Sequence, residues 1–160
     1  MKKEIANFNI NGQDHELLIS PNTVLCDLLR EQLDLTGTKI ACSVGECGSC
    51  TVLINDRPAL SCCTLAMSVR EKRVVTSEGL SQGKELHPLQ QAFIDSGSVQ
   101  CGFCTPGMIM TAAGLLILNP EPSREEVVEG LGSNICRCTG YVKIVDAVVA
   151  AVVHMKREAK

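Results

Sequence analysis

The chain has 160 residues and a formal net charge of -3, with ten cysteines, three phenylalanines, one tyrosine and no tryptophan. Its length allows one or two small domains, and its slightly acidic charge gives no support to a nucleic-acid partner. The low aromatic content also argues against base-stacking platforms. No stretch is apolar enough to span a membrane, and no apolar signal segment stands at the start, so we expect a cytoplasmic protein.

Residues 1–77 are predicted to form a small sheet with one packed helix. The predicted strands are 4–10, 15–19, 51–54 and 73–76. The Asn11-Gly12 pair between the first two strands favours a type I′ hairpin turn. Thr23 is predicted to cap a helix over 24–33, in which leucines recur on one face. One helix on a small sheet is the β-grasp arrangement of a plant-type ferredoxin.

Residues 78–160 are predicted to be helical, after a linker at 81–84. The predicted helices begin at His87-Pro88, Thr105-Pro106, Ser123 and Thr139. The first three end near Gly97, Leu118 and Gly132, and the last runs through Val152. Proline in a first turn, a capping box at 123–126 and a threonine cap are the start signals. The expected fold class is therefore α+β: an N-terminal β-grasp ferredoxin-like domain over 1–77 and a C-terminal four-helix bundle domain over 78–160.

Eight of the ten cysteines fall into two groups of four with different spacings. The first group is Cys42, Cys47, Cys50 and Cys62, and the second group is Cys101, Cys104, Cys136 and Cys138. Four thiolates are the ligand set of one iron–sulfur cluster, and the first spacing is the plant-type [2Fe–2S] pattern. In a reducing compartment, metal binding explains so many cysteines better than a secreted disulfide scaffold does.

The second group alone leaves two kinds of metal site open. Its spacing also suits a structural zinc site with four thiolates. However, Cys104 and Cys138 each come just before a predicted helix N-terminus, where unpaired N–H groups favour an anionic cluster. Together with the first group, this position favours iron–sulfur over zinc.

Two cysteines are left outside the groups. Cys26 lies among leucines of the predicted helix and is expected to be a buried small hydrophobe. Cys63 is adjacent to Cys62 and could be the ligand in its place. Because neighbours on a strand point to opposite faces, only one of the two is expected to reach the cluster, and spacing leaves the choice open. Apart from these metal-binding cysteines, the sequence has no catalytic motif, so the chain is not expected to transform a substrate by itself.

Three segments together resemble the small iron–sulfur subunit of the molybdenum hydroxylases, the xanthine dehydrogenase and aldehyde oxidoreductase family. These segments are 45–52, 100–108 and 134–141. The resemblance implies one [2Fe–2S] cluster in each half of the chain, held by the two cysteine groups. It makes Cys62 the fourth ligand of the first cluster, because 61–66 matches the family's Ser-Cys-Leu-x-Leu-Ala stretch. It also implies that Gln100 hydrogen bonds the pterin of a molybdenum cofactor, and that Cys138 both ligates iron and touches that pterin.

The same resemblance implies partners. They are a large subunit that binds a molybdopterin-type molybdenum cofactor and a medium subunit that binds FAD, in a hetero-oligomer such as a dimer of heterotrimers. The chain would relay single electrons through its two clusters, with the helical-domain cluster nearest molybdenum. A free-standing two-cluster ferredoxin is the alternative function. The stretches 56–60 and 139–144 further resemble the small subunit of 4-hydroxybenzoyl-CoA reductase.

Overall fold

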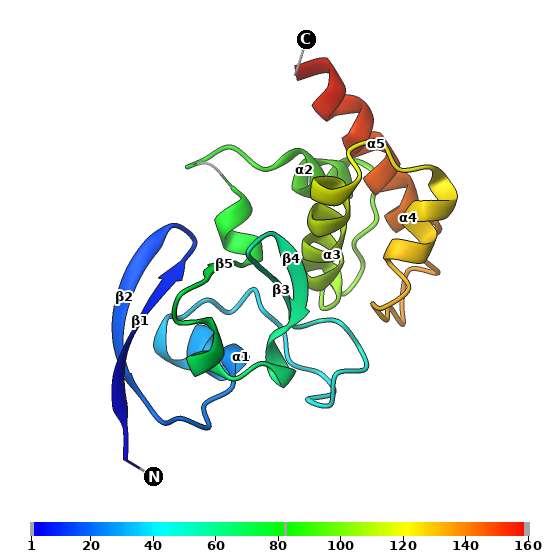
Figure 1. The fold of residues 1–160 in the computed structure, drawn as a ribbon. Helices are drawn as coiled ribbons and strands as arrows, with labels where there is room; N and C mark the ends of the chain where they lie inside the picture. The colour runs from blue at the N-terminus through cyan, green and yellow to red at the C-terminus, as the bar shows by residue number, and fades with distance from the viewer. Residues whose placement is uncertain (1, 82, 159–160) are drawn as a thin grey trace.

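A computed structural model describes residues 2–81 and 83–158, with a mixed sheet at one end and helices at the other (Figure 1). The strands are β1 (Glu4–Ile10), β2 (Gln13–Ile19), β3 (Thr51–Ile54), β4 (Arg57–Leu60) and β5 (Arg73–Val75). The α-helices are α1 (Leu25–Asp27), α2 (Pro88–Asp95), α3 (Thr105–Leu118), α4 (Arg124–Gly130) and α5 (Val142–Glu158). Shorter elements are the π-helical η1 (Leu28–Gln32) and the 3₁₀ turns η2 (Ser61–Cys63), η3 (Ala66–Val69) and η4 (Ser77–Leu80). The predicted α+β class is confirmed.

The sheet has the order β2-β1-β5-β3-β4 and begins with the predicted hairpin. β1 and β2 pair antiparallel, from Glu4 opposite Ile19 to Ile10 opposite Gln13. Asn11 and Gly12 have φ angles of 54° and 76°, the left-handed pair that a type I′ turn requires. β1 also pairs with β5 in parallel, which makes the sheet mixed.

β4 is a strand that the sequence did not predict. It pairs antiparallel with β3 across a turn at Asn55 and Asp56, whose φ angles of 47° and 67° again fit type I′. Pro58 lies in the middle of β4, and proline normally argues against a strand. The strand tolerates it because β4 is at the edge of the sheet and has a partner on one side alone.

The predicted cap of the first helix is wrong. The residue that precedes α1 is Val24, which is extended, and no side chain caps the helix. Thr23 instead uses its backbone, because its carbonyl oxygen accepts a hydrogen bond from the Ala66 N–H at 2.9 Å. This pairing with the segment after η2 delays the helix to Leu25, and the predicted single helix becomes α1 followed by η1. The leucines of these two elements are buried against the sheet.

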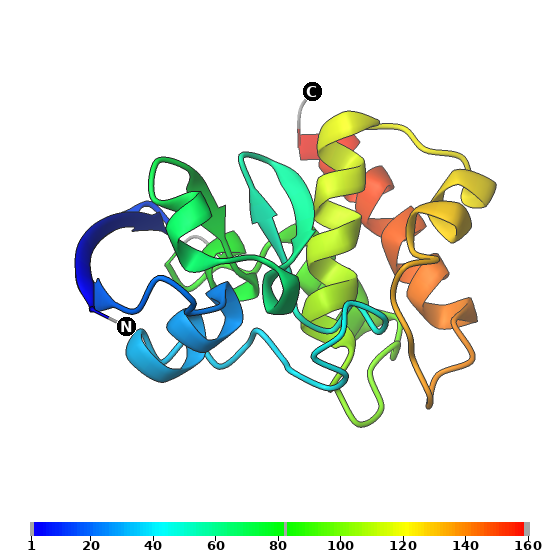
Figure 2. The ribbon, with the colours of Figure 1, turned by 60° about the horizontal axis from the view of Figure 1, so that its bottom comes forward.

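The four later helices share a second hydrophobic core. α3 is buried along most of its length and packs against β3, so that Leu53 belongs to this core and not to the core under the sheet. A Cβ placed on Gly114 of α3 would lie 2.3 Å from the Pro58 ring, which shows how closely helix and sheet approach (Figure 2). Among the described residues, no helix combines the length and apolar character needed to cross a membrane.

The helix starts follow the predictions in part. α2 begins at Pro88, and α4 begins after the predicted Ser123 capping box. The last helix begins at Val142, so the predicted Thr139 cap is wrong. Tyr141 precedes that helix with a φ of 69°, a left-handed turn that Thr139 helps to hold by accepting a hydrogen bond from the Tyr141 N–H at 3.3 Å. The predicted linker at 81–84 includes position 82, which is outside the described residues.

Candidate metal centres

The first cysteine group lies on two segments that the β3–β4 hairpin brings together. Cys42, Cys47 and Cys50 belong to the loop between η1 and β3, and Cys62 belongs to η2 directly after β4. Strand pairing places these segments side by side, and Ser61 donates its hydroxyl to the Cys50 carbonyl at 2.7 Å. The sulfurs then meet in two pairs: Cys42 with Cys47, and Cys50 with Cys62.

The glycine-containing loop supplies backbone donors to these sulfurs. The N–H groups of Val44 and Glu46 lie 3.5 and 3.3 Å from Cys42 Sγ. Chiefly through Val44, such hydrogen bonds lower the pKa of Cys42 to about 6, which favours the thiolate that a metal requires. Gly45 has a φ of 82°, and its N–H reaches the sulfur of Cys62. The left-handed backbone at this position therefore curls the loop around the site.

The second cysteine group joins the start of α3 to the loop between α4 and α5. Cys104 is the residue that precedes α3, and Cys101 lies one turn before it. Cys101 Sγ and Cys138 Sγ are 3.6 Å apart, and Cys104 contacts Cys136. Thr139 donates its N–H to Cys136 Sγ at 3.4 Å and places its hydroxyl 3.0 Å from the same sulfur. The structure thus brings all four predicted residues of this group together, again in two pairs.

The environments of the sulfurs differ within each group. Burial raises the pKa of Cys50 to about 11 and, with the neighbouring Cys136, raises that of Cys104 to about 12. Burial also acts against ionisation of Cys136, but hydrogen bonds from Thr139 outweigh it and lower the pKa. A buried thiol gives up its proton when a bound cation compensates the charge. Both groups are therefore suited to positively charged metal centres.

The pairing of sulfurs fits two-metal clusters. In the first group Cys42 pairs with Cys47 and Cys50 with Cys62, and in the second group Cys101 pairs with Cys138 and Cys104 with Cys136. Two thiolates on one tetrahedral metal lie about 3.8 Å apart when the metal–sulfur bonds are about 2.3 Å long. The distance of 3.6 Å between Cys101 Sγ and Cys138 Sγ agrees with such a pair. Two pairs in each group match a cluster of two irons, each with two cysteine ligands.

The two sites are joined by direct hydrogen bonds. The N–H of Ile135, next to Cys136, donates to the Cys47 carbonyl oxygen at 2.9 Å. Asn134, which is 3% exposed, donates its side-chain amide to the Gly48 carbonyl at 2.9 Å and accepts from the Thr111 hydroxyl at 2.7 Å. Sequence reasoning did not single out Asn134 or Ile135, although both stand in the segment 134–141.

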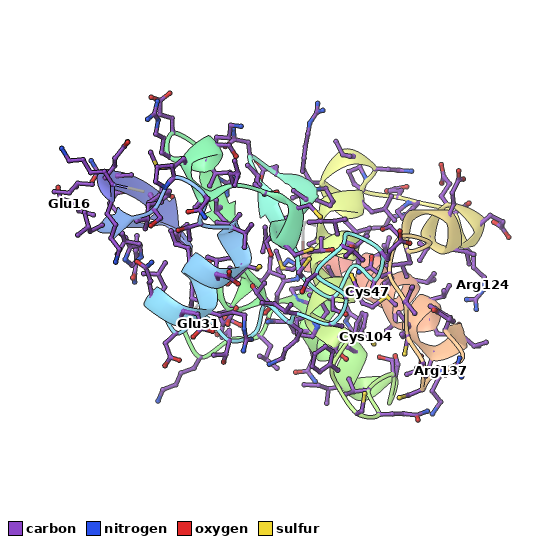
Figure 3. All side chains as sticks on the ribbon, turned by 90° about the horizontal axis from the view of Figure 1, so that it is seen from below. Glu16, Glu31, Cys47, Cys104, Arg124 and Arg137 are labelled. Atoms are coloured by element: carbon purple, nitrogen blue, oxygen red, sulfur yellow. The ribbon has the colours of Figure 1, made fainter. Side chains whose placement is uncertain are left out.

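Close backbone packing holds the same junction. A Cβ on Gly107 of α3 would lie 2.4 Å from the Gly48 carbonyl oxygen, so a side chain there would push the first loop away from the helix. Figure 3 shows the labelled Cys47 and Cys104 at the middle of the molecule, between the sheet and the helices. The two candidate centres therefore lie next to each other at the junction of the two halves.

Exposure gives the second site an inner and an outer side. Cys104 and Cys136 are buried, whereas Cys101 and Cys138 are exposed. Gln100, directly before Cys101, is exposed as well. The buried Cys136 is on the side of the first site, because it directly follows Ile135, whose N–H bonds the Cys47 carbonyl. The exposed pair and Gln100 are accessible to another molecule.

The two remaining cysteines have different outcomes. Cys26 is 2% exposed, as predicted, and burial raises its pKa to about 12. The expectation that Cys62 and Cys63 point to opposite faces is wrong. They lie in the 3₁₀ turn η2 and not in a strand, so alternation does not apply, and their sulfurs are 3.7 Å apart.

Comparison with known proteins identifies both halves. Residues 8–67 match a 2Fe-2S iron-sulfur cluster binding domain, and residues 76–149 match a [2Fe-2S] binding domain. The nicotinate dehydrogenase small FeS subunit of Eubacterium barkeri is 48% identical over 95% of this chain and 97% of its own length. The chain belongs to the small [2Fe–2S] subunits of the molybdenum hydroxylase family. It is the electron-transfer subunit of an oxidoreductase, and two [2Fe–2S] clusters carry the electrons.

Other relatives of this small [2Fe–2S] subunit show the same module in different settings. The structure of quinoline 2-oxidoreductase from Pseudomonas putida 86 contains a chain with 45% identity and a TM-score of 0.93, and the match covers 98% of both chains. Aldehyde oxidoreductase of Megalodesulfovibrio gigas is 43% identical over 92% of this chain, which spans 17% of that longer protein. The module therefore occurs both as a separate chain and as part of a larger polypeptide.

Proposed function

We propose that this subunit relays single electrons between the molybdenum site of a large partner and an FAD subunit or external acceptor. Its ligands are assigned as Cys42, Cys47, Cys50 and Cys62 for the first cluster, and as Cys101, Cys104, Cys136 and Cys138 for the second. The first cluster belongs to a β-grasp ferredoxin-like domain over 1–77, and the second belongs to a four-helix domain over 78–160. The clusters supply the one-electron chemistry, and the protein supplies their position and environment.

The hydrogen bond from the Ile135 N–H to the Cys47 carbonyl carries this proposal. It joins a residue next to a ligand of the second cluster to a ligand of the first cluster, at 2.9 Å. A relay needs its centres held at a fixed short separation, and the buried Asn134 contacts hold the same two loops together. Each cluster is also surrounded by its own N–H donors, which contribute to its reduction potential.

The exposed side of the second site is proposed to face the large subunit. Cys101 and Cys138 lie at the surface beside Gln100, as the ligands nearest a partner's cofactor should. We assign Gln100 as a hydrogen-bond partner of the molybdopterin and Cys138 as a residue that contacts the pterin while it ligates iron. Electrons then pass through the buried pair, between the molybdenum side and the first cluster with its flavin partner.

The assembly is proposed to be a hetero-oligomer and not a free-standing ferredoxin. Aldehyde oxidoreductase supports this assignment, because there the equivalent module is one part of a much longer chain. A diffusing carrier would also have no need for a second cluster that exposes two of its ligands for docking. We propose a dimer of heterotrimers, and the molecular mass of the native complex tests this assembly.

The substrate is determined by the large subunit. Relatives are nicotinate dehydrogenase and nicotine 6-hydroxylase small subunits, so N-heteroaromatic compounds such as nicotinate are the first substrates to assay. 4-Hydroxybenzoyl-CoA is the second, because of the stretches 56–60 and 139–144. Xanthine and aldehydes complete the panel.

Purification of the native complex tests the proposal. We expect a molybdopterin-containing large chain and a flavin-containing chain to co-elute with this subunit, with two distinct [2Fe–2S] paramagnetic signals after reduction. A protein that elutes alone with both signals would favour the ferredoxin alternative. Bound zinc without visible absorption would contradict both functions.

A further inference from the structure

Cys63 is a fifth thiol at the first cluster site. Its Sγ is 3.7 Å from Cys62 Sγ, and both residues belong to the turn η2. A Cβ placed on Gly45 would lie 3.0 Å from Cys63 Sγ. Since the Gly45 N–H reaches the Cys62 sulfur, the Cys63 sulfur lies against the same loop that curls around the site.

The position of Cys63 differs from that of the other unassigned cysteine. Cys26 is 2% exposed within the core, whereas Cys63 is exposed at the surface of the site. A rotation of χ1 between staggered wells moves a cysteine sulfur by about 3 Å. That movement is comparable with the 3.7 Å between the two sulfurs. A change of χ1 rotamer is therefore of nearly the size that is needed for the Cys63 sulfur to take the place of the Cys62 sulfur.

We propose that Cys63 is an alternative fourth ligand of the first cluster and replaces Cys62 when that residue is lost. The inference rests on the proposed function, because it presupposes a cluster at this site. In the exchange, the Cys63 thiol releases its proton to solvent and its thiolate forms the iron–sulfur bond that Cys62 no longer makes. Three cysteine ligands stay unchanged, so the number of thiolates and their total charge are conserved. The more exposed ligand gives the cluster a different reduction potential.

Four variants of the intact complex test the proposal: Cys62→Ala, Cys63→Ala, the double variant and Cys47→Ala. Cys47 is the matched control, because no extra thiol is adjacent to it in the sequence. We expect Cys62→Ala to keep the first-cluster paramagnetic signal with shifted g values, and Cys63→Ala to resemble the unmodified protein. The double variant and Cys47→Ala should lose that signal together with about half of the iron. The signal of the second cluster reports that each variant has folded.

Alkylation followed by mass spectrometry gives an independent readout. Cys63 should react with iodoacetamide in the unmodified complex and become protected in Cys62→Ala, where iron occupies its sulfur. Loss of the first cluster in Cys62→Ala, as in Cys47→Ala, would overturn the proposal. So would a double variant that keeps the cluster, or a Cys63 that is alkylated in Cys62→Ala. If the unmodified protein itself held no iron–sulfur cluster, the proposed function would fail instead.

Discussion

Replacing Asn134 by alanine should loosen the junction between the two cluster sites. The side chain is buried, and it donates to the Gly48 carbonyl at 2.9 Å and accepts from the Thr111 hydroxyl at 2.7 Å. The Gly48 carbonyl keeps other donors, because the N–H and hydroxyl of Thr51 also reach it. The Thr111 hydroxyl is buried within α3 and can turn to its own helix backbone.

The expected loss of stability at the junction follows from the hydrogen bonds that Asn134→Ala removes. One of these, from the Ser133 hydroxyl at 3.2 Å, joins neighbouring residues and does not cross the junction. The two hydrogen bonds to Gly48 and Thr111 contribute about 1 kcal/mol each, and their partners find replacements, so we expect a loss of about 2 kcal/mol. This free energy corresponds to a change of about 30-fold in the equilibrium for opening the junction. Hydrogen exchange in the holoprotein measures it at the Ile135 amide, which bonds the Cys47 carbonyl.

The exposed Asn7 provides a matched control, and Thr111 provides a test of coupling. Asn7→Ala changes an exposed asparagine of β1 and should leave exchange at Ile135 unchanged. Thr111→Val removes one of the same hydrogen bonds, so its effect and that of Asn134→Ala should not add in the double variant. Unchanged protection of Ile135 in Asn134→Ala, or full additivity with Thr111→Val, would refute this account of the junction.

Two further predictions concern the contacts that position the first site. Gly114→Ala should lower the free energy of unfolding measured in urea by about 1–3 kcal/mol, because the new Cβ would overlap the Pro58 ring. Adding Pro58→Ala should restore part of this loss. No recovery in the double variant would contradict the steric explanation. Glu78 accepts hydrogen bonds from the Gly37 N–H at 2.7 Å and the Thr76 hydroxyl at 2.6 Å; although burial opposes them, these bonds lower its pKa. Its stabilising effect is therefore present above the unfolded pKa of about 4.3 and is lost as pH falls through the lower folded value. Glu78→Gln should unfold at lower urea concentration than the unmodified protein at pH 7, and this difference should shrink as the pH falls below about 4.3. Glu85→Gln is the control, and a difference that stays constant with pH would argue against the carboxylate.

Much of the fold could be predicted because its signals are local. The Asn11-Gly12 turn, the Ser123 capping box and Pro88 at a helix start each set the backbone through neighbouring residues. The cysteine spacings predicted two groups of four, and in the structure the sulfurs of each group lie near one another in two pairs. Such features need little information from distant parts of the chain.

The wrong predictions occur where contacts between residues distant in the sequence determine the local structure. Thr23 does not cap a helix, because its carbonyl is engaged by Ala66. β4 contains a proline that is tolerated at a sheet edge, a position that depends on the whole strand order. Asn134 was not singled out because its partner, Gly48, is 86 positions away. The alternation argument for Cys62 failed because a 3₁₀ turn, and not a strand, carries it.

Stopped-flow reduction of the intact complex carrying Cys136→Ala tests the relay most directly. Cys136 is a proposed ligand of the second cluster, and it follows Ile135, whose N–H bonds Cys47. We predict that substrate still reduces molybdenum at the rate of the unmodified complex, while electrons fail to reach the first cluster and the acceptor. Cys63→Ala, which leaves both ligand sets intact, should pass electrons normally. Acceptor reduction at the unmodified rate in Cys136→Ala would contradict the account.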